Sequence, residues 1–271
     1  MSPYPIRVSE ISRPALRASE LNVRLAGSLG WDVSVLAETG STNADLAVRA
    51  REGARAGTVL VADLQTAGRG RSGRSWSAPP RSSLAVSVLL RPVDIPAERW
   101  GWLPLLAGVA VAEVVRRVAQ LEATLKWPND VLVDDRKLAG LLAERVDGGV
   151  GPALVLGIGL NTTLTAEERP VPTATSLLLE GAAETDRTKV LVAVLSELGE
   201  RYAGWAAAGG DPEASGLLPA YTGLCSTLGR HVRVELPGGE ALTGRAEAVD
   251  TEGRLVVDGR AVSAGDVVHV R

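Results

Sequence analysis

Residues 65–76 read Gln-Thr-Ala-Gly-Arg-Gly-Arg-Ser-Gly-Arg-Ser-Trp, in which three glycines (68, 70 and 73) alternate with three arginines (69, 71 and 74). An apolar run at 58–64 precedes this stretch and another at 84–90 follows it, so we expect a loop between two strands. Glycine lets backbone N–H groups approach a ligand, and arginine offers a planar set of donors to carboxylate or phosphate. The stretch predicts a loop that wraps an anion, with a solvated basic loop as the alternative.

Two nucleotide-binding patterns occur inside this loop, but the residues after it argue against both. Gly68-x-Gly70-x-x-Gly73 matches the dinucleotide fingerprint, and Gly68-x-x-x-x-Gly73-Arg74-Ser75 is a Walker loop with arginine in place of lysine. Both patterns require a helix to begin at the last glycine, so that its N-terminus can hold a phosphate. Residues 77–80 are Ser-Ala-Pro-Pro, and the two prolines prevent a helix there. Neither nucleotide-binding fold is expected.

The composition is that of an ordinary globular protein of one large domain or two unequal ones, with 271 residues, 45% of them hydrophobic and 23% charged. A net charge of −3 gives no overall basic field for nucleic acid. The single cysteine, Cys225, excludes a disulfide framework and a paired-cysteine metal site. The N-terminus lacks the apolar core of a signal peptide, and the longest apolar run, near 103–112, is too short to span a bilayer. We therefore expect a cytoplasmic protein.

Hydrophobic periodicity divides the chain into two parts. We expect a helix over 16–29 that ends at Gly30, and a second helix that opens with a capping box from Thr42 to Asp45 and ends near Gly53. Later helices are predicted at 100–119, 187–205 and up to about 221, and strands at 33–36, 58–64, 84–90, 124–127, 131–133, 137–146 and 153–160. From residue 227 the pattern changes to short β-runs with glycine turns, at 231–236, 241–249, 254–257, 261–262 and 267–270. That spacing is typical of a small open barrel.

The scarce polar residues gather at the ends of the predicted strands. Lysine occurs only at 126, 137 and 189, and asparagine only at 22, 43, 129 and 161. Most of these residues fall in four short runs: Ser41-Thr42-Asn43, Lys126-Trp-Pro-Asn-Asp130, Lys137-Leu-Ala-Gly140 and Gly157-Ile-Gly-Leu-Asn161. Each run alone could be a helix cap, a turn or a packing contact. Together they indicate a site, because sites are built at strand ends.

Histidine occurs only at 231 and 269, near the C-terminus. The body of the chain therefore has no histidine to act as the base of a Ser-His-Asp or Cys-His system. A covalent enzyme nucleophile of that kind is not expected.

The chain resembles the biotin–protein ligases, because its motifs stand in the order found in that family. These motifs are the runs given above, extended to Gly40-Ser-Thr-Asn43, together with Gln65-Thr-Ala-Gly-Arg-Gly-Arg71 and Trp76. The resemblance is close over about 33–161, and the C-terminal β-region fits by architecture alone. The family usually has a basic residue where this chain has Ser72, so the loop is slightly less charged here. The resemblance implies an α+β fold: a mixed central sheet with flanking helices over 1–222, and an SH3-like β-barrel over 223–271.

The resemblance also implies a two-step ligation. Biotin and Mg²⁺-ATP give biotinyl-5′-AMP and pyrophosphate, and a lysine of a biotin carboxyl-carrier domain then displaces AMP. Lys137, Arg69 and Arg71 would act in catalysis. The implied biotin-binding residues are Ser41, Thr42, Asn43, Gln65, Gly68, Arg69, Gly70, Arg71, Lys137 and Gly140. The implied ATP-binding residues are Arg71, Arg74, Trp76, Lys126, Asn129 and Asn161, and the metal ligands stay unassigned. We expect residues 66–78 to become ordered around the adenylate, because fixing glycines among like charges has a high entropic cost.

The expected partner is the biotin carboxyl-carrier domain of an acyl-CoA carboxylase. Family members that repress transcription carry a helix-turn-helix domain before the Ser-Thr-Asn motif, whereas only forty residues precede Ser41 here, so we expect a single-function ligase without DNA binding. Two alternatives remain open. One is a lipoate or octanoate ligase of similar fold, whose linear acyl pocket has no use for the Ser-Thr-Asn and Gln donors. The other is a non-catalytic biotin- or nucleotide-sensing protein, against which the intact lysine and arginines argue.

Overall fold

The computed structural model describes residues 11–27, 30–236, 239–263 and 265–270. Its larger sheet has the strand order β1-β2-β3-β7-β6-β5-β4, with β1 and β2 parallel and every other neighbouring pair antiparallel. The strands are β1 (Asp32–Leu36), β2 (Thr58–Ala62), β3 (Ser83–Leu90), β4 (Ala123–Lys126), β5 (Asp130–Val133), β6 (Arg136–Val146) and β7 (Ala153–Asn161). The expectation of a mixed central sheet with flanking helices is confirmed.

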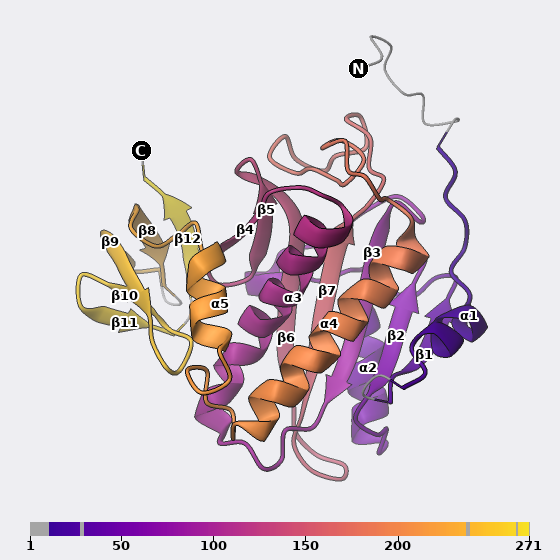
Figure 1. The fold of residues 1–271 in the computed structure, drawn as a ribbon, viewed down its shortest axis with the longest axis horizontal. Helices are drawn as coiled ribbons and strands as arrows, with labels where there is room; N and C mark the ends of the chain where they lie inside the picture. The colour runs from indigo at the N-terminus through magenta and orange to yellow at the C-terminus, as the bar shows by residue number, and fades with distance from the viewer. Residues whose placement is uncertain (1–10, 28–29, 237–238, 264, 271) are drawn as a thin grey trace.

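Helices cover both faces of this sheet (Figure 1). The helices are α1 (Ala18–Arg24), α2 (Thr42–Arg51), α3 (Trp102–Val118), α4 (Arg187–Ala207) and α5 (Leu217–Leu224). Alternating residues of β7 explain the two layers, because successive side chains of a strand point to opposite faces. Leu156, Ile158 and Leu160 join the main core with α3 and α4, whereas Val155 packs with α2. Gly157 and Gly159 alternate in step with Val155, so they lie on the face of the sheet that α2 covers.

Three predictions of local structure need correction. Helix α1 ends at Arg24 rather than at Gly30, because the backbone already turns to positive φ at Gly27. The N-cap of α2 is Ser41, whose extended backbone precedes the helix and whose hydroxyl accepts from the Ala44 N–H; the Asp45 carboxylate binds the Thr39 hydroxyl instead of closing a capping box. The helix expected from residue 100 begins as a 3₁₀ turn (Ala97–Gly101) and becomes α3 at Trp102.

The C-terminal region forms a second sheet of five antiparallel strands in the order β11-β10-β9-β8-β12. This sheet agrees with the small β-domain expected from the short β-runs and their glycine turns. Its strands are β8 (His231–Glu235), β9 (Ala241–Val249), β10 (Leu255–Val257), β11 (Arg260–Val262) and β12 (Asp266–His269). The domain boundary expected at 222/223 stays a prediction; helix α5 ends at Leu224.

Two buried tryptophans fix the second sheet against the first domain. The Trp102 and Trp127 indole nitrogens donate to the carbonyl oxygens of Thr251 and Gly253, at 2.9 and 3.0 Å. A Cβ at Gly101 would lie 2.7 Å from the Glu252 carbonyl oxygen, so the backbones are in close contact there. This packing brings β12 to the edge of the cavity described next.

Candidate active site

A cavity of about 970 Å³ lies on the α2 face of the larger sheet. Strands β3, β5, β6 and β7 form its floor, the Gly/Arg loop (residues 65–77) its cover, and residues 170–174 one wall. The predicted site residues that line it are Ser41, Thr42, Asn43, Gln65, Arg69, Gly70, Arg71, Arg74, Trp76, Lys126, Asn129, Lys137, Gly140 and Asn161. Gly68 does not line the cavity. Its place is in the turn of the loop, where a Cβ would lie 2.3 Å from the Trp76 carbonyl oxygen.

Small residues make the floor deep enough for large side chains from the cover. Ala85, Gly159 and Gly140 are direct neighbours across β3, β7 and β6. A Cβ at Gly159 would meet the Trp76 ring at 2.5 Å, and one at Gly157 would meet Asn43 Oδ1 at 2.4 Å. The two glycines singled out in the sequence are therefore required by packing, because any side chain would displace a residue of the site.

The neutral end of the cavity, which consists of Ser41, Thr42, Asn43 and Gln65, is held by a chain of hydrogen bonds. Gln65 Oε1 accepts from the Thr42 backbone N–H at 2.9 Å, and the Thr42 hydroxyl lies 2.7 Å from that of Ser87. Ser87 in turn contacts Asn43 Oδ1 at 2.5 Å. Thr42, Asn43 and Ser87 are buried, so these groups are fixed before any ligand binds.

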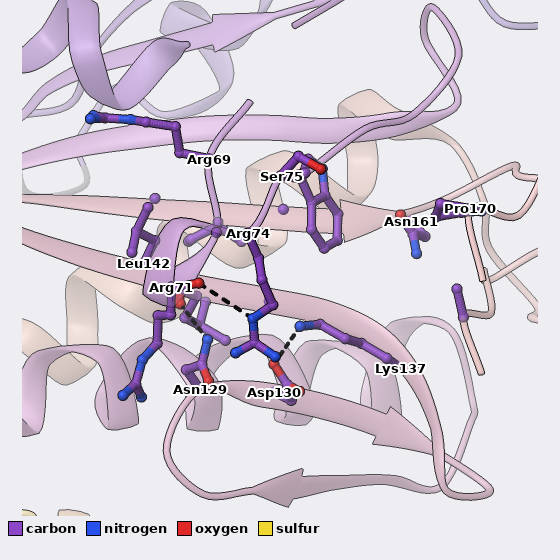
Figure 2. Close-up of a pocket in the computed structure, with 18 of the residues that line it drawn as sticks. Arg69, Arg71, Arg74, Ser75, Asn129, Asp130, Lys137, Leu142, Asn161 and Pro170 are labelled. Carbon is purple, nitrogen blue, oxygen red and sulfur yellow. Dashed lines mark hydrogen bonds and ion pairs between the residues drawn. The ribbon is translucent and has the colours of Figure 1, made fainter. Parts of the chain in front are cut away.

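The charged end comprises Arg71, Arg74, Lys126, Asp130 and Lys137. Lys137 Nζ pairs with Asp130 Oδ1 at 2.6 Å and lies 6.0 Å from the Trp76 ring centroid (Figure 2). Burial lowers the pKa of Lys126 below its ordinary value; the adjacent Asp130 opposes that shift and Lys137 adds to it. Burial also lowers the pKa of Arg71. Within the described part of the chain, four cations are close to only two carboxylates, Asp130 and Asp266, so this end has an excess of positive charge for an anion.

Arg69 lies apart from the other cations of the loop. Figure 2 shows its side chain pointing away from Lys137 and Asp130. Its guanidinium pairs with Glu144 at 2.9 Å, beside the neutral end. The expected contact of Arg69 with the reacting carboxylate and phosphate stays a prediction.

The two asparagines expected at the nucleotide also hold the backbone. Asn129 Nδ2 donates to the Leu141 carbonyl oxygen and Asn161 Nδ2 to that of Thr175, both at 2.9 Å. The buried indole nitrogen of Trp76, by contrast, has no hydrogen-bond partner within the described residues. Trp76 lines the cavity, so this nitrogen is a buried donor next to it that the described part of the chain leaves unpaired.

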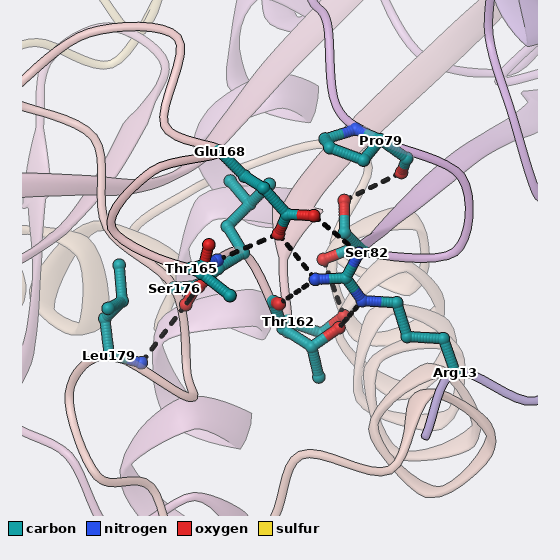
Figure 3. A network of polar contacts seen from close by, with 10 residues as sticks. Arg13, Pro79, Ser82, Thr162, Thr165, Glu168, Ser176 and Leu179 are labelled. Carbon is teal, nitrogen blue, oxygen red and sulfur yellow. Dashed lines mark hydrogen bonds and ion pairs between the residues drawn. The ribbon is translucent and has the colours of Figure 1, made fainter. Parts of the chain in front are cut away.

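The wall at 170–174 is anchored on both sides. Lys137 binds it through its backbone, since its N–H donates to the Thr173 carbonyl oxygen and its own carbonyl accepts from the Thr175 N–H. On the outer side the Arg13 guanidinium forms a two-pronged ion pair with Glu168, at 2.6 and 2.9 Å (Figure 3). Its Nε also donates to the Thr163 hydroxyl. The N-terminal segment thus fastens the loop that precedes the wall.

The second domain supplies residues that the sequence analysis missed, namely Arg230, Val268, His269 and Val270. Asp266 pairs with Arg74 at 2.6 Å and joins the loop to β12. Burial, with the charges of Lys126 and Arg230, lowers the pKa of His269 to about 4. Arg230 approaches Nδ1 of this neutral ring and can only donate, so Nε2 carries the proton toward the Thr227 hydroxyl.

Three more residues of the first domain were missed or left without a role. Ser87 and Glu144 support the neutral end from β3 and β6, and each contacts residues many positions away in sequence. Asp130 was quoted only as part of a motif, although its acidic side chain two residues after a proline turn was a usable signal.

The described residues contain no group of three or more His, Cys, Asp or Glu side chains arranged to hold a metal ion. None of the helices in the described part of the chain has the length and hydropathy needed to cross a bilayer.

Similarity to known proteins agrees with this geometry. Residues 38–161 match the Biotin/lipoate A/B protein ligase family, and residues 227–270 match the Biotin protein ligase C terminal domain. The biotin–[acetyl-CoA-carboxylase] ligase of Mycobacterium tuberculosis is 48% identical over 269 residues, which are 96% of this chain and 97% of the relative. The bifunctional ligase/repressor BirA of Escherichia coli is 32% identical over 84% of this chain and 70% of its own length.

Among solved structures, the biotin protein ligase of Aquifex aeolicus in complex with biotin and ATP superposes with a TM-score of 0.70. It is 28% identical, and the match covers 88% of this chain and 98% of that one. The chain therefore belongs to the biotin protein ligases of the biotin/lipoate A/B protein ligase family.

Proposed function

We propose that this chain ligates biotin to a lysine of a biotin carboxyl-carrier domain, using ATP and forming biotinyl-5′-AMP as the intermediate. One observation carries the proposal: a neutral, hydrogen-bonding end and a cationic end share one cavity, and Trp76 and Lys137 lie at their junction. Biotin has the matching polarity, with an uncharged ureido ring at one end and a carboxylate at the other. The M. tuberculosis relative is named for acetyl-CoA carboxylase, which supports a carrier domain of that enzyme class as the acceptor.

The neutral end supports recognition of the ureido group. Gln65 Oε1 is occupied by the Thr42 N–H, so the amide of Gln65 is left with donors for the ureido carbonyl. The Thr42 hydroxyl proton is directed to Ser87 or Gln65, so its free lone pair can accept a ureido N–H. A fatty acyl chain offers neither group, which disfavours a lipoate or octanoate substrate.

In the first step a biotin carboxylate oxygen attacks the α-phosphorus of ATP, and the bond to pyrophosphate breaks. Negative charge concentrates at the carboxyl–phosphate junction. Lys137 is a compact cation held by Asp130, and we assign it to that junction; Arg71 and Arg74 supply further donors from the cover. In the second step the carrier lysine attacks the acyl carbon, an amide bond forms and AMP leaves.

Mg²⁺ would accompany ATP and neutralise part of the triphosphate charge. Mg²⁺ in such sites is bound by substrate phosphates and only one or two carboxylates. The cavity fits that requirement, since it offers the Asp130 carboxylate and the Asn129 amide oxygen without a cluster of acidic side chains in the described residues.

The test is pyrophosphate release by the full chain with biotin plus ATP, followed by mass spectrometry of a carrier domain. We expect release to require both substrates, and the carrier to gain one biotinyl group on one lysine. Lipoate in place of biotin should support neither reaction. Binding of biotin and ATP without release would indicate a sensing protein and would contradict the proposal.

A further inference from the structure

Glu144 lies on β6 behind the neutral end and does not line the cavity. One oxygen of its carboxylate, Oε2, accepts from two residues of the site. Asn43 Nδ2 donates to it at 2.7 Å and Arg69 Nη2 at 2.9 Å. Asn43 belongs to α2 and Arg69 to the Gly/Arg loop, so a single carboxylate connects the sheet, the helix and the cover.

The contact with Asn43 determines the direction of the hydrogen-bond chain. An ionised carboxylate can only accept, so Asn43 must present its NH₂ group to Glu144 and its Oδ1 to Ser87. Ser87 has one hydroxyl proton and gives it to Asn43, which leaves its oxygen as an acceptor for Thr42. The other acceptor for Asn43 Nδ2, the Leu142 carbonyl oxygen, is 3.3 Å away and is a weaker constraint.

The contact with Arg69 closes the cover. Arg69 is the first of three arginines in the loop, and their like charges oppose a compact turn. Glu144 cancels one of these charges and attaches the loop to β6, on the side of the cavity opposite the Arg74–Asp266 pair.

We propose that Glu144 is a positioning residue with two effects: it selects the Asn43 orientation that leaves Thr42 an acceptor toward the cavity, and it fastens the Gly/Arg loop through Arg69. The first effect rests on the biotin binding that the proposed function requires, whereas the second concerns the chain without any ligand.

Glu144→Ala removes both contacts, and Glu144→Gln is the conservative comparison. The glutamine Oε1 can occupy the position of Oε2 and accept from both donors, without the charge. Glu144 is 31% exposed, so neither change should prevent folding. Glu122→Ala is the matched control, because it removes a surface ion pair with Arg116 that does not line the cavity.

Calorimetry of biotin binding to the full chain tests the first effect. We expect Glu144→Ala to weaken binding about 10- to 100-fold, as for loss of a charge-assisted hydrogen bond, and Glu144→Gln to recover most of the loss. KM for ATP at saturating biotin should change less than about threefold. Ser87→Ala should weaken biotin binding as well, and the double variant should lose less than the product of the two single effects.

Trypsin cleavage without ligand tests the second effect, since the loop contains Arg69, Arg71 and Arg74. Cleavage should be faster in Glu144→Ala than in the wild type or in Glu122→Ala. Unchanged biotin affinity together with unchanged cleavage would overturn the proposal. The proposal would also be overturned if Glu144→Ala raised KM for ATP by the same factor by which it weakens biotin binding. The same holds if Glu144→Gln weakened biotin binding as much as Glu144→Ala does. A wild type that binds biotin but releases no pyrophosphate would refute the proposed function and leave this inference standing.

Discussion

At the neutral end of the cavity each polar side chain is bonded to another protein group, whereas at the charged end four cations face two carboxylates, Asp130 and Asp266. The neutral end is built on α2 and the central strands, and Thr42, Asn43 and Ser87 are buried. The charged end takes Arg71 and Arg74 from a loop and is bordered by His269 of the second domain. One end is therefore formed in advance, and the other needs the negative charge of its ligand.

This difference separates two physical tasks. Recognition of an uncharged ring depends on hydrogen-bond direction, which requires fixed partners. Stabilisation of a charge that develops during reaction depends on cations whose repulsion is relieved only when the anion is present. Substitutions at the neutral end should therefore change affinity for biotin, and those at the charged end should change the rate of adenylation.

The largest effect is expected for Lys137→Ala, which should slow adenylation about 10²- to 10³-fold, because the cation at the reacting junction is lost. Biotin affinity should change much less. Lys137→Arg should also be substantially impaired, since a planar guanidinium on a longer stem cannot replace a compact ammonium. Single-turnover pyrophosphate release measures the rate, and Lys189→Ala, on the surface beside Glu184, is the control. Normal turnover in Lys137→Ala would transfer the role to Lys126 or an arginine.

Patterns of neighbouring residues predicted those parts of the site that consist of short runs of sequence. The runs around Lys126, Lys137 and Gly157 lie at strand ends, and alternation of apolar residues placed the strands to within a few residues. Ser87 and Glu144 were missed because neither belongs to one of the short polar runs, and their partners are 44 to 101 positions away in the sequence.

The contribution of the second domain could not be predicted for a different reason. Arg230 and His269 reach the cavity because the second domain packs against the first, in part through the bonds from Trp102 and Trp127 to the carbonyl oxygens at 251 and 253. A contact with a backbone carbonyl leaves no pattern in the side chains of the accepting segment. The N-cap of α2 could not be assigned from the sequence either. Ser41 and Thr42 are both residue types that suit an N-cap, and only the backbone geometry distinguishes them.

An intermediate effect should follow from adding one methyl group to the floor. Gly157→Ala would place a carbon 2.4 Å from Asn43 Oδ1, so it should raise KM for biotin about tenfold or more and leave KM for ATP nearly unchanged. Gly159→Ala would displace the Trp76 ring at the junction and should affect both substrates. Steady-state kinetics distinguishes the two, with Gly204→Ala in open space on α4 as the control. Identical kinetic profiles for the two floor variants would show that the ends are not separate.

A smaller effect is expected for the ion pair between Arg74 and Asp266. The Arg74 side chain is 59% exposed, so screening by water and salt reduces the pair to under about 1 kcal/mol. Asp266→Asn should lower kcat/KM for ATP about two- to fivefold at low ionic strength, and the difference should vanish near 0.5 M salt. A loss that persists at high salt would mean that Asp266 acts by shaping the domain contact rather than through charge.

The smallest effect concerns His269, which tests whether the second domain is a fixed wall of the charged end. Its pKa in the folded chain is about 4, below the ordinary value of 6.5, so the folded state binds fewer protons than the unfolded state between these values. The contribution of His269 to the free energy of unfolding must therefore fall as the pH decreases from about 6.5 to 4, and it must stay level above that window. His269→Gln, which keeps a donor for Thr227, should flatten that part of the curve. Chemical denaturation of both proteins at several pH values gives the difference directly, because the carboxylates contribute equally to each. Parallel curves would show that His269 is solvated in the folded protein and that β12 does not close the cavity.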